Sequence, residues 1–284
     1  MSDRPKIAFQ GEPGANSHEA ARDYYPDYEP LACATFEDAF EVIRNGTAAL
    51  GMIPVENSIA GRVTDVHHLL PDSGLRIIGE RFKPIRFHLM ANSGVALGQV
   101  KTVASMSIAL GQCRKTLRKL GVKTEAVGDT AGAAKALAEH PDPTRAAIAP
   151  ALAAEIYGLE ILKRDVEDER HNTTRFLIMT AERDPARPPA GAPCVTSFVF
   201  RVRNLPAALY KALGGFATNG VNMTKLESYM ENGAFTATFF YAEVDGRPED
   251  QALANAFEEL GFFCEKFEIL GVYAADPYRE RAGR

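Results

Sequence analysis

Residues 75–92 read LRIIGERFKPIRFHLMAN, and this stretch decides how the first 180 residues fold. It is a long extended segment that charges and Pro84 interrupt, whereas its surroundings alternate short apolar runs with helix-like periods. Such alternation predicts parallel strands with helices on both faces. We therefore expect 75–92 to be a crossover strand between two α/β lobes. If a strand near 174 returns to the first lobe, a cleft and a hinge lie between the lobes.

The elements around this crossover follow from the same periodicity. Thr35 with Asp38 resembles a capping box, and Gly121 after two basic residues is typical of a helix end. Strands are predicted at 6–11, 48–55, 100–105, 122–127, 145–149 and 174–180, and helices at 18–25, 36–45, 107–120 and 131–140.

A proline-rich segment, ERDPARPPAGAP at 182–193, is typical of a semi-rigid linker and predicts a domain boundary. We expect a first domain over 1–183, with lobe 1 at about 1–80 and 168–183 and lobe 2 at about 81–167, then a linker over 184–193 and a second domain over 194–284. The second domain has the order βαββαβ, a ferredoxin-like α+β sandwich. Its predicted elements are a strand at 195–203, a helix that Pro206 initiates, strands at 221–230 and 234–244 around a Glu231-Asn232-Gly233 turn, a helix around 253–260 and a strand at 262–273.

Composition excludes several classes of protein. The chain has 284 residues, 46% of them apolar, and 32 basic against 37 acidic residues give a net charge of −5. No global basic field would recruit nucleic acid or an anionic membrane. Four widely spaced cysteines lack metal-ligand spacing, so we expect no metal site. Without an apolar leader or an 18-residue apolar run, the chain is predicted to be soluble and cytoplasmic.

Four motifs occur in an order and spacing that resemble prephenate dehydratase with a C-terminal ACT domain: PVENSIAG at 54–61, SMSIALGQC at 105–113, NTTRF at 172–176 and LES at 226–228. The resemblance extends from about residue 7 to 273. It implies conversion of prephenate to phenylpyruvate, water and carbon dioxide in phenylalanine biosynthesis. It also implies a two-lobed catalytic domain of the type II periplasmic-binding kind, and an ACT domain that senses L-phenylalanine.

The same resemblance assigns the site. Thr174 would serve the leaving hydroxyl, but because a free threonine is a very poor acid, it must donate a hydrogen bond or relay a proton. His171 and Glu56 are the nearest titratable residues in the sequence. Aromatisation drives the reaction, so no cofactor or metal is required. The substrate-binding residues implied are Ser17, Glu56, Asn57, Ser105, Gln112, Arg175 and Phe176.

Departures from the family concentrate in the regulatory half. The usual Gly-Ala-Leu-Val is Ala207 to Tyr210 here, and the usual Glu-Ser-Arg-Pro is Glu227 to Met230. The methyl group of Ala207 narrows the space through which a ligand could approach the backbone. The missing Arg removes a guanidinium that could donate two parallel hydrogen bonds to a ligand. A phenylalanine site between ACT domains of a homodimer or homotetramer is expected from Ala207, Ala208, Leu209, Asn222, Glu227 and Ser228.

Two other functions stay open at this point. Arogenate dehydratase differs only in an amine on the substrate's side chain, and the sequence does not distinguish the two. A non-catalytic amino-acid sensor could use the same two-lobed fold to bind and close without chemistry.

Overall fold

The computed structural model describes residues 4–230 and 237–282. Its contacts divide the chain into two compact units. The first unit comprises Met1–Val66 and Phe82–Phe176, and the second comprises His67–Arg81 and Leu177–Arg284. The boundaries fall inside two strands, β5 (Arg76–Pro84) and β11 (Thr173–Thr180), so each of these strands begins in one unit and ends in the other.

The first sheet has the strand order β2-β1-β3-β11-β5, with the short β4 (Gly61–Arg62) paired to β3. Its first strands are β1 (Lys6–Gln10), β2 (Glu29–Cys33) and β3 (Leu50–Asn57), and β1 is parallel to both neighbours. Helix α1 is Asn16–Tyr24 and helix α2 is Phe36–Arg44. The predicted capping box is confirmed, because Thr35 accepts from the Asp38 amide and the Asp38 carboxylate accepts from the Thr35 amide.

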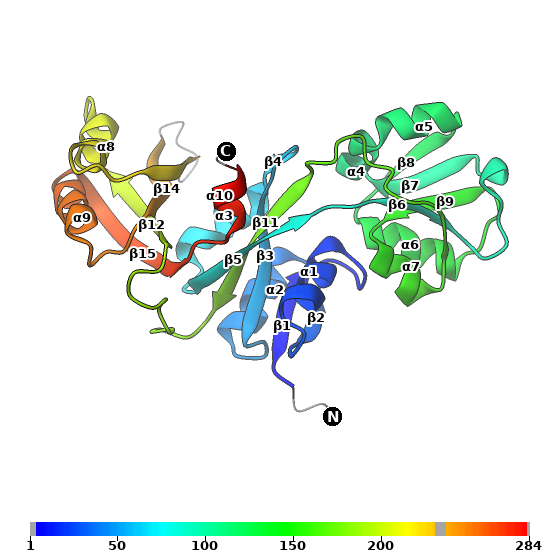
Figure 1. The fold of residues 1–284 in the computed structure, drawn as a ribbon, viewed down its shortest axis with the longest axis horizontal. Helices are drawn as coiled ribbons and strands as arrows, with labels where there is room; N and C mark the ends of the chain where they lie inside the picture. The colour runs from blue at the N-terminus through cyan, green and yellow to red at the C-terminus, as the bar shows by residue number, and fades with distance from the viewer. Residues whose placement is uncertain (1–3, 231–236, 283–284) are drawn as a thin grey trace. The chain divides into compact units, whose positions relative to one another are not determined.

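The second sheet has the order β10-β6-β9-β7-β8. Strand β7 is parallel to β8 and β9, whereas β6 is antiparallel to β9 and β10. Helices α4 and α5 lie on one face and α6 and α7 on the other (Figure 1). The strands are β6 (His88–Ala91), β7 (Thr102–Met106), β8 (Lys123–Val127), β9 (Arg145–Ala149) and β10 (Glu160–Lys163), and the helices are α4 (Ser107–Gln112), α5 (Arg114–Leu120), α6 (Thr130–Glu139) and α7 (Ala151–Tyr157).

Two predicted elements are divided in the structure. The helix expected over 107–120 breaks at Cys113, whose ψ of 18° leaves the helical range, and Asp168 accepts from the amide of Lys115 where the second helix starts. The crossover expected over 75–92 is two strands, β5 and β6, separated by residues 85–87, where the Ile85 amide donates to the Asn172 carbonyl. In both places a loop distant in sequence supplies the partner.

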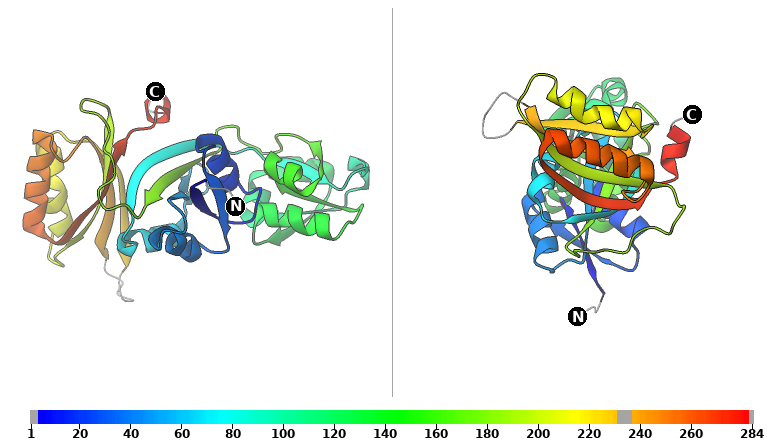
Figure 2. Two further views of the ribbon diagram at one scale, coloured as in Figure 1. Left: turned by 90° about the horizontal axis from the view of Figure 1, so that it is seen from below. Right: turned by 90° about the vertical axis from the view of Figure 1, so that its left-hand side faces the viewer.

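The third sheet is antiparallel, with the order β13-β14-β12-β15. Helices α8 and α9 cover one face of it (Figure 2), and stacked aromatic rings such as Phe198 on Phe216 fill the layer between. The βαββαβ order matches the sequence prediction, while the expected turn at 231–233 lies outside the described residues. The elements are β12 (Cys194–Val202), α8 (Ala208–Thr218), β13 (Met223–Met230), β14 (Ala237–Asp245), α9 (Gln251–Phe263) and β15 (Cys264–Ala274).

Several short elements were not predicted. They are β2, β4, β10, α7, helix α3 (Thr64–Leu69), the 3-10 turns Leu70–Asp72 and Leu97–Gln99, and helix α10 (Tyr278–Ala282). Each offers too few residues for a hydrophobic period to emerge.

Within the second unit, residues 67–81 pack closely against β15. A Cβ placed on Gly271 would lie 2.0 Å from the carbonyl oxygen of Ile77, so no side chain fits there. Nearby, Arg76 donates to the Ile269 carbonyl at 2.6 Å. Glycine is therefore required at 271 because the backbone of Ile77 approaches closely, and not because of a turn.

We expect Gly271→Ala to lower the free energy of unfolding by about 1 to 3 kcal/mol, because the methyl group forces the two backbones apart. Thermal or urea unfolding of the full chain measures this. Gly214→Ala is the matched control, since Gly214 lies in α8 with open space around its Cα. That change should stabilise the helix slightly, and equal effects of the two substitutions would contradict the steric argument.

Candidate active site

The ends of β3 and β11 bring together two residues that are far apart in the sequence. Asn57 is the last residue of β3, and Thr174 is the second residue of β11. The Asn57 Nδ2 donates to the Thr174 Oγ1 at 2.9 Å. The structure thus joins two of the residues that the sequence assigns to substrate handling.

The orientation of the Asn57 amide is fixed by backbone. Its Oδ1 accepts from the amides of Ile59 and Ala60 at 3.0 and 2.9 Å, so the side chain cannot flip without losing both bonds. Its Nδ2 donates to Thr174 and, at 2.7 Å, to Asn172 Oδ1. Both hydrogens of this nitrogen are directed to protein, so the amide is placed to orient Thr174, and the predicted contact of Asn57 with the substrate stays a prediction.

Thr174 can therefore act as a donor. Because its Oγ1 already accepts from Asn57, the hydroxyl hydrogen is directed elsewhere. The side chain is partly exposed, whereas the neighbouring Thr173 and Arg175 are buried. A hydroxyl in this setting is preorganised to donate to an oxygen atom of a bound molecule.

Gln112, at the end of α4, completes a ring of amides. Asn172 Nδ2 donates to Gln112 Oε1 at 3.0 Å, and Gln112 Nε2 lies 3.5 Å from Asn57 Oδ1. The ring joins the end of β3, the residue before β11 and the end of helix α4. The sequence analysis did not assign Asn172 to the site, although it opens the NTTRF motif.

A cavity of about 420 Å³ lies beside this ring. It is within the size range of small-molecule sites. Gln112 and Asn172 line it, whereas Asn57 and Thr174 do not. Its other side chains include two exposed isoleucines, one lysine and three carboxylates: Ile59, Ile108, Lys115, Glu167, Asp168 and Glu169. Larger cavities elsewhere contain none of the ring residues. The hydrogen-bonded ring of amides with Thr174, not the volume of a cavity, therefore identifies the candidate site.

Glu56 and Arg175 lie on the opposite face of the sheet, because adjacent residues of a strand point to opposite sides. The Arg175 NH1 donates to Glu56 Oε1 at 2.9 Å, and Arg175 is only 3% exposed. The guanidinium also lies 5.8 Å from the ring centre of Phe82. This geometry does not place Arg175 or Glu56 beside Thr174, and their contact with the substrate stays a prediction.

Three other predicted residues are buried in the fold. Ser105 has no exposed surface and donates to the Ile148 carbonyl at 2.6 Å, so it holds β7 against β9 rather than facing the cavity. Phe176 is completely buried and packs in the core. Ser17 is 8% exposed in the first turn of α1. Burial of these side chains could not be deduced from motif position alone.

No titratable residue is hydrogen-bonded to Thr174 within 4–230 and 237–282. His171 is exposed, and its Nδ1 lies 4.0 Å from Glu169. Burial raises the pKa of the Cys113 thiol well above its ordinary value, which keeps it protonated and unreactive. Over the same described ranges, no group of three or more His, Cys, Asp or Glu side chains could hold a metal ion.

Two histidines of the first unit, one partly and one fully buried, accept hydrogen bonds from backbone amides. His18 Nδ1 accepts from the Gly14 amide at 2.9 Å, and His88 Nδ1 accepts from the Asp165 amide at 3.2 Å. Burial lowers the pKa of both imidazoles. Protonation would therefore break a backbone hydrogen bond in each case.

We expect the free energy of unfolding to fall as the pH drops below about 6.5. The unfolded histidines take up protons there, while the folded ones, with their lower pKa, do not, so acid favours unfolding. The slope is limited to about 1.4 kcal/mol per pH unit for each histidine. Urea unfolding from pH 8 to 5 measures it, and His88→Gln should remove part of the slope; an unchanged slope would exclude His88.

The predicted effector residues lie in the third sheet and α8. Ala207 has a φ of 62°, a left-handed conformation that favours glycine, immediately before α8. Asn222 donates to the Asp245 carboxylate at 2.7 Å, and Glu227 pairs with Lys225 at 3.3 Å. Ala208 is buried, whereas Leu209 is partly exposed and Ser228 is exposed.

Tyr229 stands where the resembled family has Arg. Its hydroxyl lies 3.0 Å from the Nδ1 of His67, which is 1% exposed, and the His67 ring contacts Tyr241 edge-on. The strand β13 is thereby connected to helix α3.

No helix among the described residues combines the length and apolar character that a membrane span requires.

Several known proteins resemble this chain in sequence. The sequence profile described as prephenate dehydratase matches residues 7–184. A bifunctional N-acyl-homoserine lactone acylase/prephenate dehydratase of Komagataeibacter europaeus is 49% identical over 97% of this chain and 98% of its own length. Arogenate dehydratase 2 of Petunia hybrida is 37% identical over 96% of this chain and 72% of its own.

A solved structure resembles the chain as well. The crystal structure of prephenate dehydratase in complex with L-Phe from Arthrobacter aurescens has a TM-score of 0.87, with 31% identity over 95% of this chain and 90% of that one. Together with the profile match over most of the chain, these relatives show that the protein belongs to the prephenate dehydratase family.

Proposed function

We propose that this protein converts prephenate to phenylpyruvate, water and carbon dioxide. The observation that carries the proposal is the Thr174 hydroxyl, which accepts from a backbone-fixed amide of Asn57 and is left with its own hydrogen to donate. The leaving group in prephenate is a ring hydroxyl, and a directed donor is the group that its departure requires.

The reaction can proceed without any charged residue beside the threonine. As the bond between the ring and its carboxylate breaks, the electron pair enters the ring, carbon dioxide leaves, and the opposite C–O bond breaks. The hydroxyl takes one proton, supplied ultimately by solvent, and becomes water. Thr174 donates a hydrogen bond to that oxygen, and Gln112 Nε2 is placed to donate to a carboxylate.

Incubating the protein with prephenate and following the absorbance of phenylpyruvate tests the proposal. We expect turnover without added cofactor. A protein that bound prephenate without forming product would instead be the amino-acid-sensing binding protein that the sequence leaves open.

Arogenate dehydratase is the second candidate, because relatives at 37% identity carry that name. Arogenate has an amine where prephenate has a keto group, so the two substrates share both carboxylates and the leaving hydroxyl. The ratio of kcat/KM for prephenate and arogenate, measured side by side, separates these activities.

We further propose that 194–284 is an ACT domain that binds L-phenylalanine, and that 1–183 is the catalytic domain. The βαββαβ order and the related structure solved with L-Phe support this. A homodimer or homotetramer with phenylalanine between ACT domains, and a cytoplasmic location, stay predictions. Light scattering with and without phenylalanine tests the assembly.

We expect Tyr229→Phe to weaken the response of turnover to phenylalanine severalfold while leaving basal kcat nearly unchanged. The change removes the hydroxyl that joins β13 to His67 on α3. Because β13 carries the predicted effector residues Glu227 and Ser228, this removes one connection between them and the segment that follows Asn57. Titrating phenylalanine against rate measures it. Tyr210→Phe is the control, since Tyr210 is 80% exposed, and a response unaltered by Tyr229→Phe would exclude this connection.

A further inference from the structure

We propose that Asn172 is a positioning residue that sets the direction in which Gln112 presents its amide to the substrate. The inference rests on the proposed prephenate dehydratase activity. Asn172 is completely buried, and it lies immediately before β11. Its carbonyl accepts from the Ile85 amide at 2.8 Å, so the backbone at this position is anchored independently of the side chain.

Two backbone amides fix the orientation of the side-chain amides in the ring. Ile59 and Ala60 hold the Oδ1 of Asn57, which forces the Asn57 Nδ2 toward Asn172. Asn172 must therefore turn its own oxygen toward Asn57. Its Nδ2 then necessarily points to Gln112.

Gln112 is the third amide in this series of hydrogen bonds, after Asn57 and Asn172. Because Asn172 Nδ2 donates to Gln112 Oε1 at 3.0 Å, the oxygen of Gln112 is turned into the ring and away from solvent. Its Nε2 makes only a 3.5 Å contact with Asn57, at the limit of hydrogen bonding, and Gln112 lines the cavity. The site therefore offers an N–H to an incoming carboxylate, where a reversed amide would offer a repelling carbonyl.

The neutrality of the ring explains why amides are used here. A buried lysine or arginine would hold one carboxylate of the dianion more strongly, but it would oppose the release of that charge as carbon dioxide. Oriented amide donors bind a carboxylate without introducing a fixed charge. Their disadvantage is that an amide can flip, and Asn172 removes that freedom.

Asn172→Asp is the sharpest test, because aspartate has the same shape and keeps the acceptor for Asn57. It cannot donate to Gln112 Oε1, so Gln112 should reverse and direct its oxygen to the cavity. We expect KM for prephenate to rise about 10- to 100-fold, the factor for one charge-assisted hydrogen bond, with a smaller change in kcat. Asn172→Ala adds no charge and should raise KM less. It tests the same proposal if the aspartate variant does not fold.

A cycle with Gln112→Ala distinguishes positioning from mere structural support. If Asn172 acts through Gln112, the double variant Gln112→Ala/Asn172→Ala should have nearly the KM of Gln112→Ala alone. Asn92→Asp is the control, since Asn92 is another asparagine of the first unit whose Nδ2 donates to protein, here to the Leu137 carbonyl, and it lies outside the amide ring. It should lower stability without changing KM.

The outcomes separate this inference from the proposed function. A wild-type protein that forms no phenylpyruvate overturns the function itself. Turnover by the wild type, combined with an unchanged KM in both Asn172 variants or with additive effects of Gln112→Ala and Asn172→Ala, overturns the positioning role and leaves the function standing.

Discussion

Thr174→Ala is expected to lower kcat by about 10²- to 10⁴-fold, the range for one positioned proton donor, and to leave the fold intact. The partly exposed side chain contributes little packing, and the Asn57 amide that loses its acceptor still bonds to Asn172. Steady-state kinetics with prephenate measures the loss, and circular dichroism checks the fold. KM should change little, because the hydrogen bond to the leaving oxygen strengthens as the reaction proceeds.

Two further substitutions make this result specific. Thr174→Ser retains the hydroxyl and should keep most of the turnover. Thr173→Ala removes the adjacent hydroxyl, which donates to the His171 carbonyl, and should affect stability more than rate. If Thr174→Ala turned over at nearly the wild-type rate, Thr174 would have no part in the mechanism.

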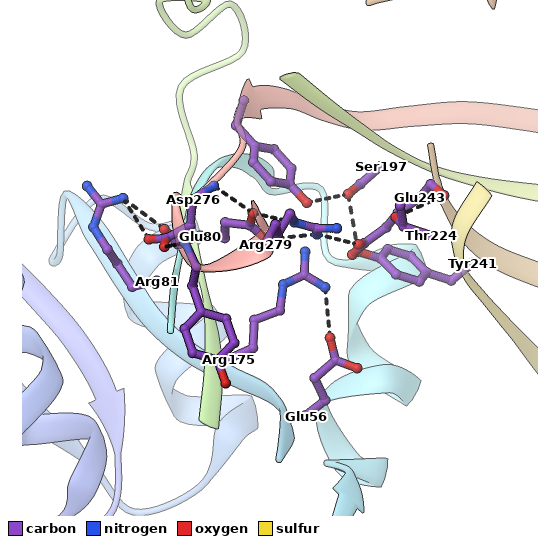
Figure 3. Close-up of polar contacts among 12 residues, drawn as sticks. Glu56, Glu80, Arg81, Arg175, Ser197, Thr224, Tyr241, Glu243, Asp276 and Arg279 are labelled. Carbon is purple, nitrogen blue, oxygen red and sulfur yellow. Dashed lines mark hydrogen bonds and ion pairs between the residues drawn. The ribbon is translucent and has the colours of Figure 1, made fainter. Parts of the chain in front are cut away.

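Arg279→Met is expected to lower the free energy of unfolding by about 3 to 5 kcal/mol. Arg279 donates to both oxygens of Glu80, at 2.6 and 2.9 Å, and to Glu243 at 3.0 Å. Both carboxylates are at most 1% exposed, and Glu243 also accepts from Tyr241 at 2.5 Å (Figure 3). Removing the guanidinium leaves two buried negative charges close together, which is far more costly than losing a surface ion pair.

Urea unfolding of the full-length variant measures this cost. Arg44→Met is the matched control, because Arg44 pairs with Glu41 with both side chains at least half exposed, and it should cost less than about 1 kcal/mol. Arg279→Lys should be intermediate, since an ammonium cannot bind both Glu80 oxygens in the same fork geometry. Equal stabilities of the Arg279 and Arg44 variants would contradict the buried network.

Local signals in the sequence located the regular elements of the fold well. The Thr35 cap, the glycine after α5 and the βαββαβ order of the last domain each depend on neighbouring residues, and the structure contains all three. The break at Cys113 was missed because its cause, Asp168, lies fifty-five residues further along the chain. A hydrophobic period depends only on neighbouring residues, so it gives no information on a partner so far away in the sequence.

The candidate site shows the same limit. Motif resemblance selected Thr174, Asn57 and Gln112, and the structure brings them together. It could not show that Arg175 points to the other side of the sheet, because that depends on strand alternation from a known register. Nor could it find Asn172, whose role depends on which end of each amide faces the next.

Residues 67–81 belong by contact to the same unit as the C-terminal domain, although the chain reaches that domain only through the proline-rich segment. Gly271 against Ile77 and Arg279 against Glu80 hold the two together without help from the peptide connection. A protease that nicked the chain between Thr180 and Cys194 would therefore yield two fragments that still migrate as one species. Separating the two fragments would require a denaturant. The proline-rich segment therefore keeps the two parts of the chain close together while they fold, and it is not needed to hold them together afterwards.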